Sequence, residues 1–183
     1  VELIVDAGCR WTLAEACAVA DELKAVGLKF LEEPLWPPEN FDGLAELRKT
    51  SGIPISAGEN VSTPMEFERM LAAGAVDFVQ PSPAKMGGIT ELCKVFPLAD
   101  VHNIPVMTHS FYGGPGLLAA VHAAAALGGP EAMVEWRWFD LEASIYGDAL
   151  TPQQGWVSVP RGPGLGIDPD PDVVSAYRTE TSR

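Results

Sequence analysis

The stretch KFLEEPLWPPEN, residues 29–40, begins like a β-strand and then stops abruptly. Its apolar start is followed by two carboxylates, Glu32 and Glu33, which stand directly before Pro34. Like charges at the end of a buried strand repel each other, so an isolated strand gains nothing from this arrangement. The stretch therefore raises the question of what balances these two acids.

Strand-like apolar segments alternate with segments of helical periodicity along most of the chain. Thr12 with Glu15, and Thr63 with Glu66, have the spacing of capping boxes at helix starts. This alternation indicates the α/β class with a parallel sheet. We expect strands within residues 1–8, 28–34, 53–60, 75–82, 104–110 and 131–139, and helices within 12–27, 38–52, 62–74, 89–103 and 114–129.

A polar residue stands at the end of every expected strand, and neighbours in this series are 23 to 27 residues apart. A (β/α) barrel needs this pattern, because its active site lies where the carboxyl ends of all strands converge. A doubly wound sheet would gather its polar residues at one switch point instead. The series is Asp6, Glu32, Glu59, Ser82, His109 and Glu135.

We therefore predict a partial TIM-type (β/α) barrel with about six strands over residues 1–139. Residues 140–183 are rich in Gly and Pro and are expected to form an irregular C-terminal tail of the same domain. Pro97 is expected to bend or shorten the helix within residues 89–103.

Composition narrows the classes of function. Of the 183 residues 47% are hydrophobic, which suffices for one sizeable core, and the net charge of -13 argues against nucleic acid or an anionic membrane as a partner. No apolar run reaches the roughly 18 residues of a membrane-spanning helix, and the first residues lack the pattern of a secretory signal. The three cysteines show no metal spacing and favour reduced thiols in a cytoplasmic protein.

Three carboxylates on consecutive strand ends, Asp6, Glu32 and Glu59, would repel each other unless a cation joined them. Oxygen ligands without Cys or paired His favour Mg²⁺, with Mn²⁺ next. Such a cation would also attract an anionic substrate to a chain of negative charge. Glu33 is then expected either to support the ligands from behind or to point the other way along its strand.

Seven short motifs, in this order, resemble the barrel of the enolase superfamily, mandelate racemase subgroup: VDAG, LEEP, AGEN, PAKMGGIT, MTHS, VEW and the tail VPRGPGLGI. The resemblance covers nearly the whole chain. It implies that Asp6, Glu32 and Glu59 bind Mg²⁺. It also implies abstraction of the proton α to a carboxylate, through an enediolate that the metal stabilises.

The resemblance also implies roles for residues on the later strands. His109 matches the family's catalytic histidine, Glu135 a glutamate that hydrogen-bonds the substrate carboxylate in racemases, and Lys85 a lysine beside the Gly-Gly pair. Ser82 departs from the family, whose members have there an Asp that pairs with the histidine, or a catalytic Lys. Gly8 replaces an Asn often found two residues after the first ligand.

The family has an N-terminal capping domain and two earlier barrel strands, and the sequence contains no match to them. We therefore interpret the sequence as a truncated member that is inactive alone and oligomerises with copies of itself when full length. With a β-hydroxyl on the substrate, His109 could assist dehydration; without one, reprotonation gives racemisation or epimerisation. The expected partner is a small anionic carboxylate.

Several residues also have a purely structural interpretation. A strand-end acid is often a helix cap, Lys85 could be a solvated loop residue, and Ser82 could hydrogen-bond a turn. His102 near a helix end and His122 in an Ala-rich helix are expected to be structural. Trp36 could line a pocket or only pack.

Two other functions remain open. Ser82 and Gly8 allow a barrel that binds a metal or ligand but has lost turnover. A different metal-dependent barrel enzyme, such as an aldolase, is also possible, although the chain lacks a clear Schiff-base lysine at a strand end.

Overall fold

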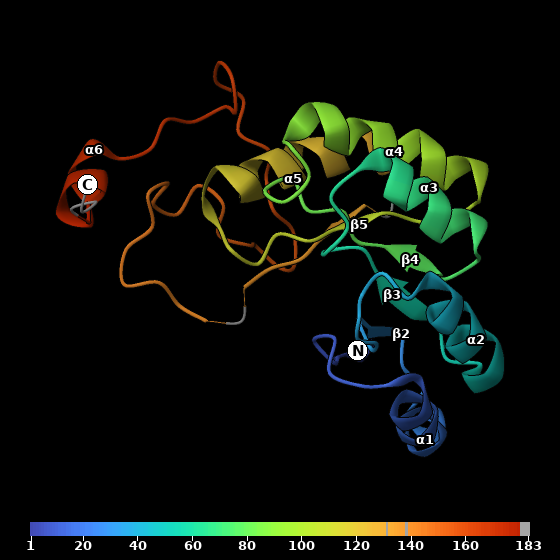
Figure 1. Ribbon diagram of the computed structural model, residues 1–183. Helices are drawn as coiled ribbons and strands as arrows, with labels where there is room; N and C mark the ends of the chain where they lie inside the picture. The colour runs from blue at the N-terminus through green and yellow to red at the C-terminus, as the bar shows by residue number, and fades with distance from the viewer. Residues whose placement is uncertain (131, 138, 180–183) are drawn as a thin grey trace.

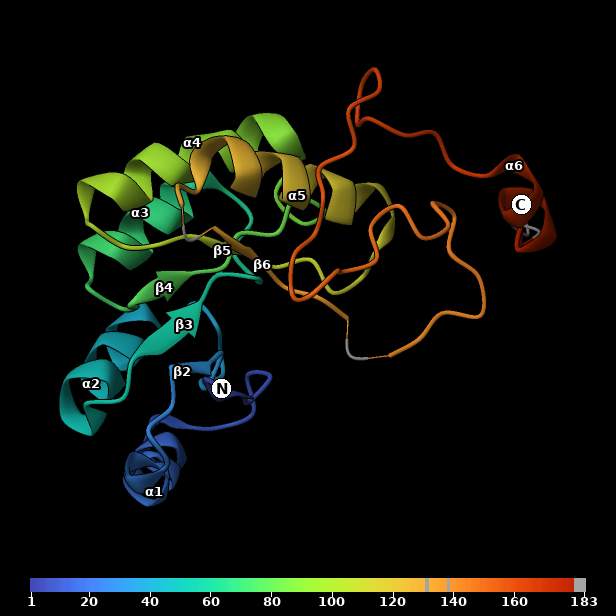
Figure 2. The same ribbon diagram turned by 180° about the vertical axis from the view of Figure 1, so that it is seen from behind.

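The computed structural model describes residues 1–130, 132–137 and 139–179, and in them six short strands form one parallel array (Figures 1 and 2). Strands β1 to β4 pair in sequence order, β5 pairs with β6, and a parallel bridge between Val79 and Val106 joins the two groups. The predicted α/β class and partial barrel are confirmed. The strands are β1 (Ile4–Asp6), β2 (Phe30–Glu32), β3 (Ile55–Ala57), β4 (Phe78–Val79), β5 (Met107–Thr108) and β6 (Met133–Val134).

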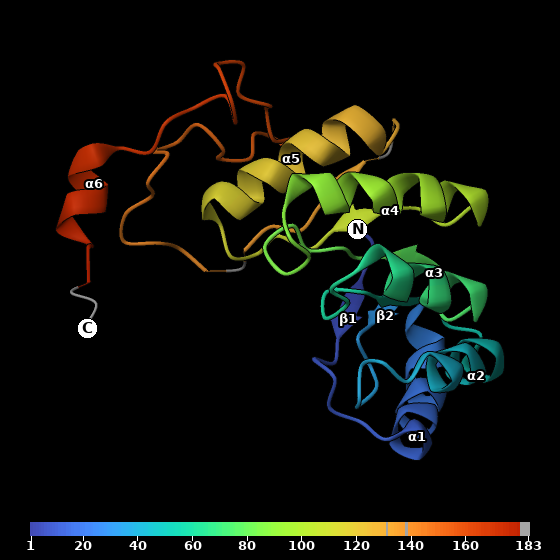
Figure 3. The same cartoon turned by 45° about the horizontal axis from the view of Figure 1, so that its top comes forward.

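A helix follows each of the first five strands, as the sequence predicted, and these helices cover the outside of the array (Figure 3). Contacts join α1 to α2, α3 to α4 and α4 to α5. The helices are α1 (Leu13–Leu23), continued by the 3₁₀ turn η1 (Lys24–Val26), then α2 (Phe41–Ser51), α3 (Pro64–Ala72), α4 (Ile89–Val101), α5 (Gly114–Leu127) and the short α6 (Pro171–Ala176).

Local sequence signals account for the helix ends. Thr12 caps α1 and Thr63 caps α3, each in a capping box with the glutamate three residues later, as predicted. Gly27 ends the α1–η1 segment at φ 71°, a left-handed conformation that glycine adopts without steric cost. These ends set where each helix returns the chain to the sheet.

The core lies between the strands and the helices. Leu31 on β2, Leu44 on α2 and Phe67 on α3 belong to one buried apolar cluster. Side chains alternate along a strand, so Phe30 and Glu32 point to the opposite face from Leu31, into the barrel. Glu32 therefore lies on the inner face that a barrel's site uses.

The array is open between its first and last strands. An apolar cavity of about 1020 Å³ is lined there by Ile4 on β1 and Val134 on β6, together with Trp136 and, from the tail, Trp156. Ile4 is 45% exposed because the inner face beside it is uncovered. The six strands thus curve around a space that they do not close.

Two details differ from the sequence-based expectation. Helix α4 continues through Pro97 to Val101, so the proline does not shorten it; burial of Val95, Phe96 and Ala99 on the sheet offsets the cost of about 3 kcal/mol. The tail includes α6, which lies far from the barrel at the end of an extended path (Figure 1). In the described part of the chain, no helix is long and apolar enough to cross a membrane.

Candidate active site

The expected metal ligands lie at the carboxyl ends of the first three strands. Asp6 and Glu32 are register partners at the last positions of β1 and β2. Glu59 stands two residues beyond β3, because that strand ends at Ala57. The carboxylate of Asp6 accepts the Gly8 N–H at 2.8 Å, which fixes the turn after β1.

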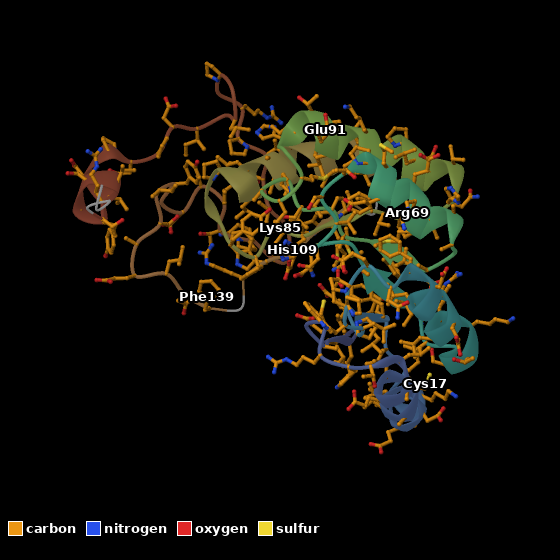
Figure 4. The ribbon with its side chains drawn as sticks, viewed as in Figure 1. Cys17, Arg69, Lys85, Glu91, His109 and Phe139 are labelled. Atoms are coloured by element: carbon orange, nitrogen blue, oxygen red, sulfur yellow. The ribbon has the colours of Figure 1, made fainter. Side chains whose placement is uncertain are left out.

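His109 lies at the centre of the site, one residue after β5, and is only 1% exposed. Its Nε2 is 3.1 Å from Glu59 Oε2 and 3.6 Å from Glu135 Oε2. Lys85 Nζ reaches the other oxygen of Glu59, Oε1, at 3.3 Å. Figure 4 shows Lys85 and His109 close together at this end of the sheet. The structure therefore brings together four of the residues that the sequence singled out.

The charge of Glu59 depends on these neighbours. Burial alone would raise the pKa of Glu59, but hydrogen bonds and attraction from His109 and Lys85 outweigh burial and lower that pKa below its ordinary value. Glu59 is therefore held as a carboxylate. Lys85 lies exposed in its loop and forms an ion pair with Glu59 there.

Glu135 is fixed from the neighbouring strand end. Its Oε2 accepts the Ser110 N–H at 3.1 Å, and Ser110 Oγ donates to the Glu135 carbonyl at 2.7 Å. These bonds tie the loop after β5 to the loop after β6. Ser110 was not identified from the sequence, although it directly follows His109 in the motif MTHS.

Ser82 is fully buried but does not bond to the His109 ring. Its Oγ is 3.0 Å from the hydroxyl of Tyr112, and that hydroxyl also donates to the His109 carbonyl at 3.1 Å. The Tyr112 ring meets the imidazole edge-on at 5.4 Å. Among the described residues, His109 Nδ1 is buried without a hydrogen-bond partner. Tyr112 was not among the residues predicted from the sequence, although it stands three residues after the histidine.

Glu32 shows how crowded the acids are. Burial, and then repulsion from Asp6 and Glu135, raise the pKa of Glu32 from 4.5 to about 8. Within residues 1–130, 132–137 and 139–179, no three His, Cys, Asp or Glu side chains are already arranged to hold a metal ion. Three carboxylates on adjacent strands, one of them strongly destabilised as an anion, nevertheless form a donor set that suits a hard divalent cation.

The other candidates lie outside this cluster. His102 is the C-cap of α4, and His122 Nε2 contacts the Leu165 carbonyl at 3.0 Å, so both have structural partners. Trp36 is 67% exposed and does not pack in the core. The three cysteines are free thiols in the structure.

Comparisons with known proteins agree with this architecture. Residues 1–173 match the family described as Enolase C-terminal domain-like. Arabinonate dehydratase of Saccharolobus solfataricus is 32% identical over 181 residues, which cover 99% of this chain and 48% of that protein. The names of other relatives also include dehydratases and cycloisomerases.

Solved structures of similar proteins share this fold. A mandelate racemase/muconate lactonizing enzyme-like protein from Rubrobacter xylanophilus superimposes with a TM-score of 0.83 at 34% identity, covering 98% of this chain and 46% of that one. L-talarate dehydratase from a Polaromonas species, solved with Mg and L-glucarate, gives a TM-score of 0.82 at 26% identity, covering 98% and 48%.

The chain spans about half the length of the curated relatives that it matches. The match itself runs almost from end to end of the chain and includes all six strands and the site at their carboxyl ends. The chain therefore belongs to the Enolase C-terminal domain-like family.

Proposed function

We propose that the whole protein abstracts the proton α to the carboxylate of a sugar acid and dehydrates that acid. One observation carries the proposal: the buried His109 Nε2 lies between the carboxylates of Glu59 and Glu135, at 3.1 and 3.6 Å. The names of the dehydratase relatives support the class of substrate. Racemisation or epimerisation of a similar acid is the second candidate.

His109 is the proton-transfer residue in this proposal. The imidazole Nε2 faces the site and lies 3.1 Å from Glu59 Oε2. In dehydration, unprotonated Nε2 would take the α-proton and then deliver it to the departing β-hydroxyl, which leaves as water. In racemisation the proton would return to the α-carbon, so the names of the dehydratase relatives, rather than this geometry, favour dehydration.

The neighbouring residues position and balance this histidine. In this proposal Glu135, held by Ser110, would hydrogen-bond a substrate carboxylate through a shared proton. Lys85 offsets part of the negative charge of Glu59. Tyr112 holds the backbone of His109 in place of a carboxylate on the ring.

Asp6, Glu32 and Glu59 would hold Mg²⁺, with Mn²⁺ as a possible substitute. The donor chemistry fits, because burial and neighbouring acids make ionised Glu32 unfavourable unless a cation balances it. When bound, Mg²⁺ would supply positive charge that stabilises the charge developing on the substrate carboxylate. The similar L-talarate dehydratase from a Polaromonas species was solved with Mg and L-glucarate.

The test is a panel of sugar acids incubated with the whole protein in D₂O. Dehydration yields a 2-keto-3-deoxy acid, whereas racemisation or epimerisation yields an isomer with deuterium at the α-carbon. We expect the dehydration product, and we expect His109→Asn to lower its rate at least about 100-fold.

His102→Asn is the matched control, since His102 lies at the end of α4 outside the site. It should leave the rate unchanged. An unaltered rate in His109→Asn would overturn the proposed role. A wild-type protein that binds sugar acids without any turnover or exchange would instead favour the non-catalytic barrel.

A further inference from the structure

Glu33 is a buried carboxylate to which the proposed reaction gives no task. It is only 2% exposed and immediately follows the last residue of β2. An ionised group at such a place is costly unless hydrogen bonds satisfy it. Burial raises the pKa of Glu33, and hydrogen bonds from Gly58, Cys9 and Glu59 oppose that rise.

The partners of Glu33 come from the two strands beside its own. Its Oε1 accepts the backbone N–H of Gly58 at 2.8 Å and that of Glu59 at 3.2 Å, both just after β3. Its Oε2 accepts the thiol of Cys9, in the turn after β1, at 3.3 Å. One side chain thus joins the carboxyl ends of β1, β2 and β3.

The backbone at Glu33 and at Cys9 also adopts unusual conformations. Glu33 has φ 39° and Cys9 has φ 57°, left-handed values that side-chain-bearing residues rarely adopt. The two residues also bond through their backbones, since Cys9 N–H donates to the Glu33 carbonyl at 2.6 Å. Strained backbone at strand ends persists only where the surroundings hold it, and it concentrates at functional sites.

The backbone at Gly58, just after β3, can adopt few other conformations. Its φ is +131°, and a Cβ added there would lie 2.8 Å from the Phe67 ring and 3.1 Å from the Gln80 nitrogen. The Glu33 bonds therefore act on a segment that can take few other conformations. That segment carries Glu59 directly to His109 and Lys85.

We propose that Glu33 is a positioning residue that fixes the strand ends bearing Asp6, Glu32 and Glu59 relative to one another, so that these carboxylates can close on a divalent cation. The inference rests on the proposed function for its purpose, but the hydrogen bonds that carry it belong to the chain without any ligand. In this proposal Glu33 is not itself a ligand of substrate or metal; it acts through the backbone amides of Gly58 and Glu59 and through the Cys9 turn.

The test compares Glu33→Ala with Asp77→Ala. Asp77 is a fair control because its Oδ2 also accepts a backbone N–H of β3, that of Ile55, at 2.9 Å, but at the opposite end of the strand. Both variants remove a carboxylate that holds β3. Only Glu33→Ala should disturb the end that carries Glu59.

Two measurements are made on each variant. Amide hydrogen exchange in the metal-free protein reports the Gly58 and Glu59 N–H groups, and calorimetric titration with MgCl₂ reports cation affinity. In Glu33→Ala we expect faster exchange at both amides and a loss of Mg²⁺ affinity of about tenfold or more. Asp77→Ala should leave both quantities as in the wild type while lowering the melting temperature.

Glu33→Gln keeps a side-chain oxygen that accepts the Gly58 and Glu59 N–H groups, so both amides should stay protected from exchange and most of the Mg²⁺ affinity should remain. This variant also provides a test if Glu33→Ala does not fold. Unchanged Mg²⁺ affinity in Glu33→Ala, or an equal loss in Asp77→Ala, would overturn the inference. If the wild type binds no Mg²⁺, the proposed function fails, whereas the exchange data still show separately whether Glu33 holds these amides.

Discussion

The two ends of the parallel sheet differ in how their charged side chains are paired. At the amino ends, Arg48 Nη2 and Asp77 Oδ1 form an ion pair at 2.6 Å, and Asp77 Oδ2 accepts the Ile55 N–H. At the carboxyl ends, buried acids outnumber the cations: Lys85 pairs with Glu59, while Glu32 carries no salt bridge in the described structure.

The difference separates charges that are paired and stabilise the fold from charges that the proposed function would use. Paired charges with backbone partners lock β3 against β4 at the amino end. Burial and neighbouring acids raise the pKa of Glu32, which destabilises the folded chain when Glu32 is ionised. Groups with perturbed pKa values are concentrated at functional sites. In (β/α) barrels the carboxyl ends carry the chemistry and the amino ends carry stability, and the arrangement of charges in this chain fits that division.

The largest expected effect is on the pH dependence of stability in the metal-free chain. Glu32 has a pKa of about 8 when folded against 4.5 ordinarily, so the folded state holds a proton that the unfolded state has lost between those values. Stability should therefore fall as pH rises from about 4.5 to about 8, by a few kcal/mol, and then level off. Urea unfolding at a series of pH values measures this.

Glu32→Gln should remove most of that fall, because a neutral amide does not titrate. The same slope in Glu32→Gln and in the wild type would mean that another group dominates the profile. The claim that unpaired acids at the carboxyl ends destabilise the folded chain would then be wrong.

A smaller effect is expected at the amino end. Asp77→Ala removes the partner of Arg48 and leaves the Ile55 N–H without its acceptor, which should cost about 1–3 kcal/mol of unfolding free energy. Thermal unfolding measures the loss. Turnover by the folded variant should not change, and a variant that loses turnover while its stability is intact would contradict the division between the two ends.

The smallest effect is expected for Tyr112→Phe. The variant keeps the ring that meets His109 edge-on but loses the hydroxyl bonded to Ser82 and to the His109 carbonyl. Loss of about 1 kcal/mol of positioning should lower kcat roughly fivefold and leave KM and Mg²⁺ affinity alone. Tyr177→Phe, at an exposed tyrosine, is the control; a drop in Mg²⁺ affinity in Tyr112→Phe would assign the hydroxyl a different role.

The sequence was sufficient to predict the six strands, the five helices after them and the approach of Glu59, Lys85, His109 and Glu135. Periodicity and capping patterns act locally, and the even spacing of polar strand ends makes their convergence a property of the barrel. The partners of Ser82 and Glu33 were not predictable, because they depend on side-chain directions in loops. A helix within residues 89–103 was expected, bent or shortened by Pro97; the helix runs on through Pro97 to Val101, where tertiary burial outweighs the local preference.

The central claim is that the acids at the carboxyl ends form a cation site, whereas the paired acid at the amino end does not. Calorimetric titration of the whole protein with MgCl₂ tests this most directly by comparing Glu59→Gln with Asp77→Asn. We predict that Glu59→Gln weakens Mg²⁺ binding by about tenfold or more, since one charge and one ligand are lost, and that Asp77→Asn leaves the affinity unchanged. Equal Mg²⁺ affinity in the wild type and Glu59→Gln would contradict the account.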